Sequence, residues 1–362
     1  MTQRLFTPYS LGQITLQNRI VMAPLTRSRA LGNQPNDLMR EYYTQRASAG
    51  LVIAEGTATA ADGLGYARIP GLFTDEQARG WGDIARSVQA RGSRLFIQLM
   101  HTGRIGHPAN LPQGGELIAP SAVAAAGEVW TDTAGMQPHP VPRAASADDL
   151  VRLRNDHVRA AELAVANGVD GVELHGANGY LLGQFLNPRS NQRTDAYGGS
   201  AANRLRFVLE VVDATIAAIG KSRVGIRLSP FNPFNDLEAN FDGEREQFLA
   251  LVAELAKRDI GYLHLAGGSV SGDLLKDTRA AFPGTIIING GYDAARAEAD
   301  LAAGLVDLVS FGRTFISNPD LPERLRTGAP LADLDAATLY TPGAAGYTDY
   351  PRLDEAEALL AD

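Results

Sequence analysis

The sequence predicts an α/β protein built as one (β/α)8 barrel, a single domain that spans residues 1–362. Eight short, β-branched apolar runs recur along the chain, and stretches with helical periodicity lie between most of them. The runs are nearly continuous rather than alternating, which is typical of parallel strands covered by helices. Many of the 38 glycines lie at the ends of these runs, where an α/β fold turns.

The predicted elements alternate between strand and helix. The strands are expected at residues 19–23, 51–55, 94–98, 171–175, 224–228, 262–265, 285–289 and 308–311. The helices are expected at residues 37–48, 74–90, 146–167, 203–220, 244–258, 271–281, 293–304 and 321–327, with the weakest pattern in 271–281. Thr74, with Gln77 behind it, indicates a capping box, and Ser146 is the expected N-cap of the longest helix.

Two stretches do not fit a minimal barrel. Within residues 1–17, the segment 5–17 has the pattern of a small hairpin that could plug the bottom of the barrel. Residues 100–145 form an insertion after the third strand that is rich in Gly, Pro and Ala. Because loops after barrel strands lie on the catalytic face, we expect this insertion to cap the site.

The main alternative fold is a doubly wound open sheet. It is weakened because no G-x-G-x-x-G motif follows a strand. Gly63-Leu64-Gly65 begins such a pattern, but Arg68 stands where its last glycine should be.

The composition excludes several classes of protein. With 45% hydrophobic residues the chain can bury a large core, so it is neither disordered nor of low complexity. A net charge of −8 without a basic block disfavours a nucleic-acid partner. The absence of cysteine excludes disulfides, thiolate catalysis and Cys-based metal sites. Without a secretory segment or a membrane-length apolar run, we expect a cytoplasmic protein that does not bind a membrane.

The last two predicted strands end in a pattern that suits a phosphate. Gly290 and Gly291 follow one strand, and Gly312-Arg313 follows the other. Glycines let backbone N–H groups approach a phosphate closely, and a guanidinium adds a forked donor. Glycines alone could simply permit tight turns, but beside Arg313 at the end of the eighth strand they favour a phosphate site.

Three other polar side chains stand at strand ends. Gln98, Arg227 and Thr26 offer an amide, a guanidinium and a hydroxyl, which suit a planar heterocycle with carbonyls and an imide N–H. Any one of them could instead be a hydrogen-bonded buried residue. Together with the phosphate site they indicate a mononucleotide-like cofactor.

The segment from His175 to Tyr180 carries the predicted reactive groups. His175 ends the fourth strand and Asn178 follows three residues later, so both could donate hydrogen bonds to one oxygen and polarise a carbonyl. The Tyr180 hydroxyl could deliver a proton to a developing carbanion. The alternative is that His175 is an ordinary core histidine, which is less favoured at a strand end beside two other polar groups.

The remaining titratable residues indicate no further site. The histidines lack metal-ligand spacing, so no metal site is predicted, and His264 is expected in the core. Glu55 and Glu173 lie within strands, where they would need partners such as Arg227. Because no carboxylate pair stands at the strand ends, a glycosidase is disfavoured.

Long runs of the chain resemble one family. Residues 173–182 read Glu-Leu-His-Gly-Ala-Asn-Gly-Tyr-Leu-Leu, and residues 191–200 read Asn-Gln-Arg-Thr-Asp-Ala-Tyr-Gly-Gly-Ser. With residues 5–8, 18–27 and 346–351, they resemble the old yellow enzyme family, which are FMN-dependent NAD(P)H ene-reductases on a (β/α)8 barrel. The resemblance covers nearly the whole chain.

The resemblance implies non-covalently bound FMN, with NADPH or NADH as the reductant. Hydride would pass through flavin N5 to activated alkenes (enones, enals, maleimides and nitroalkenes), with nitro or nitrate-ester reduction as a further activity. The protein would be a monomer or a homodimer. The residues implied to bind FMN are Pro24, Leu25, Thr26, Ala58, Gln98, His175, Arg227, Asn289, Gly290, Gly291, Gly312 and Arg313.

The resemblance also implies the catalytic roles and the substrate pocket. His175 and Asn178 would bind the substrate oxygen, and Tyr180 would donate the proton. The implied pocket residues are Tyr66, Met100, Phe234 and Tyr340. Met100 stands where the family often has tryptophan, so a roomier and softer pocket above the flavin is expected.

Two other functions use the same barrel. One is a flavin-free lyase or isomerase that binds a phosphorylated substrate at Gly312-Arg313. The other is a barrel that binds flavin without catalysing a reaction. A yellow preparation would exclude the first, and oxidation of nicotinamide by an enone would exclude the second.

Overall fold

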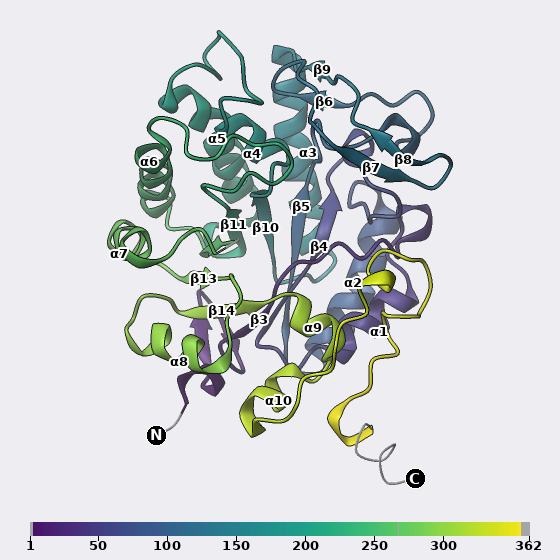
Figure 1. Cartoon of the computed structure of the whole chain (residues 1–362), viewed down its shortest axis with the longest axis vertical. Helices are drawn as coiled ribbons and strands as arrows, with labels where there is room; N and C mark the ends of the chain where they lie inside the picture. Colours follow the sequence, from purple (N-terminus) through teal and green to yellow (C-terminus); the bar gives the residue numbers. More distant parts are fainter. Residues whose placement is uncertain (1–2, 267, 356–362) are drawn as a thin grey trace.

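The computed structural model describes residues 3–266 and 268–355. Its centre is a closed barrel of parallel strands in the order β10-β11-β12-β13-β14-β3-β4-β5 (Figure 1). The barrel strands are β3 (Ile20–Met22), β4 (Leu51–Ala58), β5 (Arg94–Met100), β10 (Gly171–Gly176), β11 (Val224–Leu228), β12 (Tyr262–Leu265), β13 (Ile286–Ile288) and β14 (Leu308–Phe311). The predicted (β/α)8 barrel is therefore confirmed.

The helices surround the barrel (Figure 1). The predicted ones are α1 (Asp37–Gln45), α2 (Asp75–Gln89), α3 (Ala147–Ala166), α5 (Ala201–Ile219), α6 (Glu244–Lys257), α7 (Gly272–Ala281), α8 (Ala294–Ala302) and α10 (Leu321–Thr327). Capping boxes at Thr74 and Ser146 begin α2 and α3. The sequence did not predict two short helices, α4 (Leu181–Leu186) and α9 (Arg313–Ser317). Short 3-10 turns lie at Arg4–Phe6, Leu31–Asn33, Ala61–Gly63, Pro108–Asn110, Lys221–Arg223 and Ala336–Thr338.

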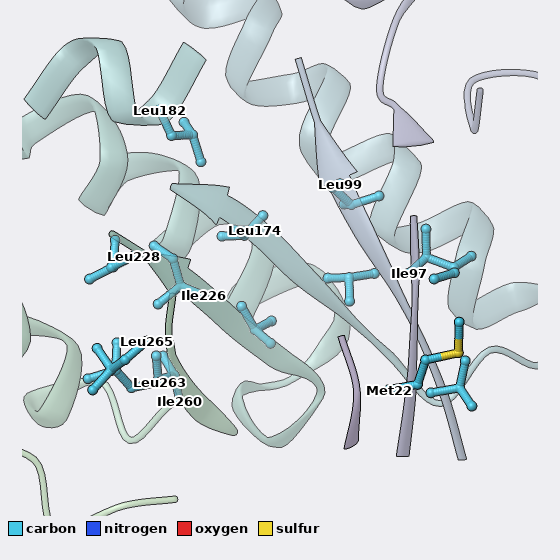
Figure 2. Close-up of a cluster of buried hydrophobic side chains, with 14 of the residues drawn as sticks. Met22, Ile97, Leu99, Leu174, Leu182, Ile226, Leu228, Ile260, Leu263 and Leu265 are labelled. Atoms are coloured by element: carbon cyan, nitrogen blue, oxygen red, sulfur yellow. The ribbon is translucent and has the colours of Figure 1, made fainter. Parts of the chain in front are cut away.

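The barrel strands place apolar side chains outward, against the helices. Leu174, Ile226 and Leu263 belong to this outer core (Figure 2). Their neighbours Glu173 and His264 hydrogen-bond to each other inside the barrel. Successive residues of a strand point to opposite faces, so each strand contributes to the outer core and to the interior. Toward the ends of the strands, the interior is polar.

A β-hairpin covers the end of the barrel at which the strands begin. It consists of β1 (Tyr9–Leu11) and β2 (Ile14–Leu16), which pair antiparallel. Leu11 and Leu16 are buried in one cluster with Leu51 and Leu308, the first residues of β4 and β14. The hairpin therefore plugs the barrel where its strands begin, away from the ends that carry the predicted site.

The insertion after β5 forms two small sheets. Strands β6 (Ile118–Ala119) and β9 (Arg143–Ala144) pair in parallel, while β7 (Glu128–Thr131) and β8 (Gly135–Pro138) form an antiparallel hairpin. The β7–β8 hairpin projects beside the barrel, above the segment that follows α10 (Figure 1).

The segment after α10 is fastened to the start of the barrel by buried arginines. Arg27 donates to the carbonyls of Leu339 (3.1 Å) and Gly346 (2.7 Å). Arg29 donates to the same Leu339 carbonyl and to the carbonyls of Arg27, Thr338 and Ala345 at 2.7–2.9 Å, and to that of Gly343 at 3.3 Å. Tyr347 stacks on Tyr42 of α1, with ring centroids 4.0 Å apart. These contacts fix residues 336–347, which we call the C-terminal strap, at the barrel mouth.

Candidate functional site

A cavity of about 710 Å³ opens where the barrel strands end. Many of the predicted site residues line it: Pro24, Leu25, Thr26, Gln98, His175, Asn178, Tyr180, Arg227, Phe234, Asn289, Gly290, Gly291, Gly312, Arg313 and Tyr340. The lining residues that the sequence did not predict are Ala23, Ala266, Tyr292, Ser310, Phe311, Thr314, Ile316 and Leu339. Of these, Ser310 could have been predicted from the sequence. It stands two residues before Gly312, and residues two apart on a strand face the same side. Leu339 reaches the cavity from the C-terminal strap, which no local pattern indicated.

Met100 and Ala58, two further predicted site residues, are not among the residues that line this cavity. Met100 is buried, and it packs into the space that the missing side chain of Gly56 leaves open. The roomier pocket expected from Met100 stays a prediction. The backbone N–H of Ala58 donates to Pro70 O, and its carbonyl accepts from Leu72 N–H, so it has no free N–H for a flavin edge. Both residues belong to a buried apolar cluster that also contains Tyr180.

The floor of the cavity is formed by Gln98 and Arg227. Gln98 Nε2 donates to Glu173 Oε1 at 2.8 Å, which leaves the amide carbonyl for a ligand. Arg227 is buried, and its Nε has no hydrogen-bond partner among the described residues. An unpaired buried guanidinium N–H is costly, so this group is suited to a ligand that accepts hydrogen bonds.

His175 is a neutral hydrogen-bond donor at the wall. Its strand neighbour in register is Arg227, and burial together with that cation holds the pKa of His175 well below 6.5. Its Nδ1 accepts from the backbone N–H of Ala177 at 3.4 Å. Because the neutral ring carries one proton, that proton lies on Nε2, which is left to bind a ligand.

Asn178 stands beside His175 in a strained conformation, with φ at 56°. Three contacts from the loop after β11 support it. Ser229 Oγ accepts from the Asn178 N–H at 2.8 Å, and Asn235 Nδ2 donates to its carbonyl at 2.8 Å. Asn232 Nδ2 donates to Asn178 Oδ1 at 3.4 Å, which leaves the Asn178 NH2 group as a second donor for one oxygen.

Tyr180 is a buried acid next to these donors. Its hydroxyl donates to Tyr66 Oη at 3.1 Å, and its ring lies edge-on to that of His175 with centroids 4.8 Å apart. Burial raises the pKa of Tyr180, and the Tyr66 hydroxyl and the Asn235 amide oppose part of that rise.

Glu55 corrects another prediction, since its partner is not Arg227. The strand β4 shifts register between Ala54 and Thr57, and Glu55 contacts α1. Glu55 accepts from Tyr43 Oη at 2.9 Å and from the Arg27 N–H at 3.2 Å. Burial raises its pKa to about 7. The carboxylate thus supports the backbone beside Thr26 rather than the cavity floor.

A second chamber of about 720 Å³ adjoins the cavity. The two share Thr26, Tyr180, Phe234 and Tyr340. Its remaining lining comes from Ser28, residues 66–68, the β7–β8 hairpin and the C-terminal strap. Tyr66 thus lies in this chamber rather than in the first cavity.

Comparison with known proteins decides the family. The model of the NADH:flavin oxidoreductase / NADH oxidase family matches residues 4–332. The chain belongs to this family. A probable flavin mononucleotide-dependent alkene reductase of Leishmania infantum is 41% identical, over 95% of this chain and 96% of that protein. The structure of morphinone reductase in complex with tetrahydroNAD is similar with a TM-score of 0.93 and 44% identity, covering 97% and 98% of the two chains. An old yellow enzyme homologue from Zymomonas mobilis has a TM-score of 0.91 and 40% identity, covering 96% and 99%.

Membership of the NADH:flavin oxidoreductase family confirms the old yellow enzyme resemblance. FMN is the cofactor, with a nicotinamide as reductant, and the flavin-free lyase or isomerase is wrong. The cavity fits this group. Gly290 and Gly291 have φ values of 150° and 69°, which L side chains rarely adopt, so the backbone at the predicted phosphate site needs glycine. Arg227 and Gln98 offer donors and an acceptor for the flavin pyrimidine.

One further property concerns membranes. Across residues 3–266 and 268–355, no helix combines the length and the apolar character that a bilayer crossing requires.

Proposed function

We propose that this oxidoreductase reduces activated alkenes, with His175 and Asn178 binding the substrate oxygen and Tyr180 donating a proton. The observation that carries the proposal is their arrangement in one cavity. Two N–H donors and one protonated hydroxyl converge above a floor of Gln98 and Arg227. FMN held in this cavity would supply hydride, drawn from NAD(P)H, to the alkene.

The protein binds the cofactor along three parts of the cavity. Gly290, Gly291, Gly312 and Arg313 would hold the phosphate, since an ideal Cβ on Gly312 would meet only Leu25, at 3.5 Å. Arg227 would place positive charge at the pyrimidine end and stabilise the anionic reduced state. The remaining contacts would come from Pro24, Leu25, Thr26, Gln98, His175 and Asn289.

The donor pair activates the alkene. A carbonyl or nitro oxygen that accepts from His175 Nε2 and Asn178 Nδ2 gains charge as hydride reaches the β-carbon. Because His175 is neutral, it stabilises this charge by hydrogen bonding without giving up its proton. The proton for the α-carbon comes from Tyr180, and once it has left, the Tyr66 hydroxyl at 3.1 Å can turn to donate to the Tyr180 oxygen.

The second chamber could hold the apolar part of a large substrate. Val129, Trp130 and Met136 of the hairpin side line it, and Pro342 lines it from the strap. Tyr180 lies at the junction of the two spaces, so an alkene held at the donor pair could extend a bulky apolar body past the tyrosine. The relative of known structure is named for reduction of morphinone. We extend the proposed substrates to enones, enals, maleimides and nitroalkenes with such bodies, and to nitro and nitrate-ester compounds.

Stopped-flow spectroscopy of the purified full chain tests the proposal. We expect flavin absorbance that survives desalting, bleaching by NADPH or NADH, and return of the colour when enones, maleimides or nitroalkenes are mixed with the reduced protein. A preparation that stays colourless after incubation with FMN contradicts the cofactor site. If the protein binds flavin but no alkene reoxidises its reduced form, alkene reduction is contradicted and the cofactor site is not. A cytoplasmic location and a monomeric or homodimeric state stay predictions from the sequence.

A further inference from the structure

A chain of polar side chains connects Gln98 on the cavity floor, through the inside of the barrel, with Ser310, which also lines the cavity. Glu173 Oε1 accepts from Gln98 Nε2 at 2.8 Å, and Glu173 Oε2 lies 2.7 Å from His264 Nδ1. His264 Nε2 lies 2.8 Å from Ser310 Oγ. All four side chains are at most 2% exposed. Buried polar groups of this number are costly unless each is paired, and this pairing is nearly complete.

The positions of these residues on the barrel strands bring their side chains together. Gln98 and Glu173 are register partners on the neighbouring strands β5 and β10. His264 and Ser310 stand on β12 and β14, and their side chains meet across the intervening β13 at 2.8 Å. Inward side chains from alternate strands fill one layer of a barrel, and here that layer is polar rather than aliphatic.

The chemistry of a carboxylate fixes the direction of every hydrogen bond in the chain. A carboxylate oxygen accepts hydrogen bonds, so the NH2 group of Gln98 faces Glu173 and the Gln98 carbonyl faces away. The same carboxylate requires a proton on His264 Nδ1, whether the ring is neutral or charged. His264 therefore occupies the second oxygen of Glu173 and keeps the carboxylate in place.

We propose that Glu173, His264 and Ser310 are positioning residues that hold the Gln98 amide with its carbonyl oxygen toward the N3–H group of the flavin. The inference rests on the proposed FMN site. An amide free to rotate would present an NH2 group half of the time, and that group would face the flavin N–H donor to donor. The buried hydrogen bonds fix the orientation of the Gln98 amide before the cofactor binds.

Ser310 completes the arrangement rather than acting as a nucleophile. Its hydroxyl lies 3.3 Å from the Ile288 carbonyl as well as beside His264, so it links the imidazole to the strand backbone. The serine, histidine and glutamate are connected as in an acyl-transfer triad, but the glutamate is engaged by Gln98. The chain of hydrogen bonds therefore ends at Gln98 on the floor of the cofactor cavity.

The test compares two flavins on the full-length apoprotein. In 3-deaza-FMN a C–H group replaces N3–H, so the shape is kept and the donor is lost. We expect the wild type to bind 3-deaza-FMN about 10- to 100-fold more weakly than FMN, measured by flavin fluorescence quenching. In Glu173→Gln the amide at position 173 can donate or accept, so Gln98 is no longer fixed in one orientation and this ratio should fall at least about twofold below the wild-type value.

A matched control is available at Glu244, a buried carboxylate that accepts from the N–H groups of Phe231 and Asn240 and does not line the cavity. Glu244→Gln should leave the ratio unchanged. If Glu173→Gln does not fold, His264→Asn gives the same comparison with the carboxylate present but released, and the ratio should again fall.

The outcomes separate the two proposals. A wild type that binds neither flavin contradicts the FMN site itself. A wild type that binds FMN with no preference over 3-deaza-FMN, or a folded variant that keeps the wild-type ratio, overturns the positioning role and leaves the FMN site intact. The flavin midpoint potential is a second readout, because a misdirected amide changes the field at the pyrimidine, and it should shift in Glu173→Gln but not in Glu244→Gln.

Discussion

Tyr180 shows how a single residue can be prepared for proton donation without being made more acidic. Burial raises its pKa from an ordinary value near 10, so its hydroxyl is fully protonated at neutral pH. Its position is fixed by the Tyr66 hydroxyl at 3.1 Å and by the edge of the His175 ring. Placement relative to the substrate therefore matters more for this group than acidity does.

Replacing that hydroxyl should affect one half of the reaction. We expect Tyr180→Phe to slow reoxidation of the reduced flavin by an enone by about 10²- to 10⁴-fold, because general acid catalysis is lost. Flavin reduction by NAD(P)H needs no proton from Tyr180 and should change less than about twofold. Stopped-flow measurement of the two half-reactions separates these effects. Tyr66→Phe, which keeps the donor, is the matched control and should cost far less, whereas equal slowing of both half-reactions in Tyr180→Phe would refute the role.

At the scale of elements, the loop between β11 and α6 acts on a neighbouring strand end. Its side chains Ser229, Asn232 and Asn235 hold Asn178 at a φ of 56° and direct the amide. A non-glycine residue in this conformation costs of order 1 kcal/mol or more, so the surrounding contacts must stabilise it.

Removal of one such contact should weaken substrate binding selectively. We expect Asn235→Ala to raise the enone dissociation constant of the oxidised enzyme by about tenfold, since the Asn178 carbonyl loses its buried partner and the donor is displaced. The FMN dissociation constant should stay within about twofold, because Asn235 does not line the cofactor cavity. Titration of the oxidised enzyme with the enone, monitored by the change in flavin absorbance, measures the first quantity, and titration with a phenol, monitored by its charge-transfer absorbance, checks the same donor pair. A parallel loss of FMN affinity would show that the loop supports the whole mouth instead.

The β7–β8 hairpin should influence substrate size. Trp130 is 52% exposed and lines the second chamber. We expect Trp130→Ala to lower kcat/KM for a polycyclic enone by about 10-fold, because apolar contact area is lost, and to leave cyclohexenone within about twofold. Val151→Ala, an exposed apolar residue on α3, is the matched control. A similar loss for both enones would mean that the chamber does not hold the bulky group.

At the scale of the whole molecule, buried histidines make stability depend on pH. His157 on α3 is fully buried, and burial lowers its pKa from 6.5 to about 4. The folded state therefore binds its proton less readily than the unfolded chain. The stability contribution of the neutral ring is complete above pH 6.5 and is lost progressively as the pH falls from 6.5 to about 4.

We expect His157→Phe, which keeps the volume but cannot titrate, to flatten this acid side of the stability profile. The difference between pH 7 and pH 4 in the free energy of unfolding should shrink by roughly 3 kcal/mol as an upper value. Urea unfolding followed by circular dichroism across that range measures it. The pKa of Glu55 is raised, so its contribution to the free energy of unfolding falls as the pH rises from 4.5 to about 7, opposite to that of His157. This contribution should be the same in the variant. An unaltered slope would place the acid sensitivity elsewhere.

Much of the barrel could be read from the sequence because its strands are buried on both faces. Runs such as residues 224–228 are apolar at outward positions and carry their polar residue, here Arg227, at a single inward one. The rule that chemistry lies at the strand ends then found His175 and Gln98. Helices α4 and α9 were missed because six and five residues are too short for a periodic signal, and packing against the barrel forms them.

The remaining part of the site depends on contacts between distant segments. The insertion at residues 100–145 was expected to cap the site, but only the structure shows that Trp130 and the strap face each other across a chamber. No local pattern indicated that Met100 packs beside Gly56, because that space is a tertiary feature. His264 was expected as a core residue, and it is buried, but its link to Glu173 requires the closed barrel.

The clasp of Arg27 and Arg29 on the C-terminal strap has a consequence for how the protein matures in the cell. Every barrel strand, the last of which ends at Phe311, leaves the ribosome before residues 336–347 can reach their arginine partners. A nascent barrel at that moment has a floor and walls but an unfinished rim at Leu339 and Tyr340. Loading of the vitamin-derived cofactor should therefore be completed only after translation of the strap, and ribosome-bound chains that stop short of residue 336 should release flavin faster than full-length chains do.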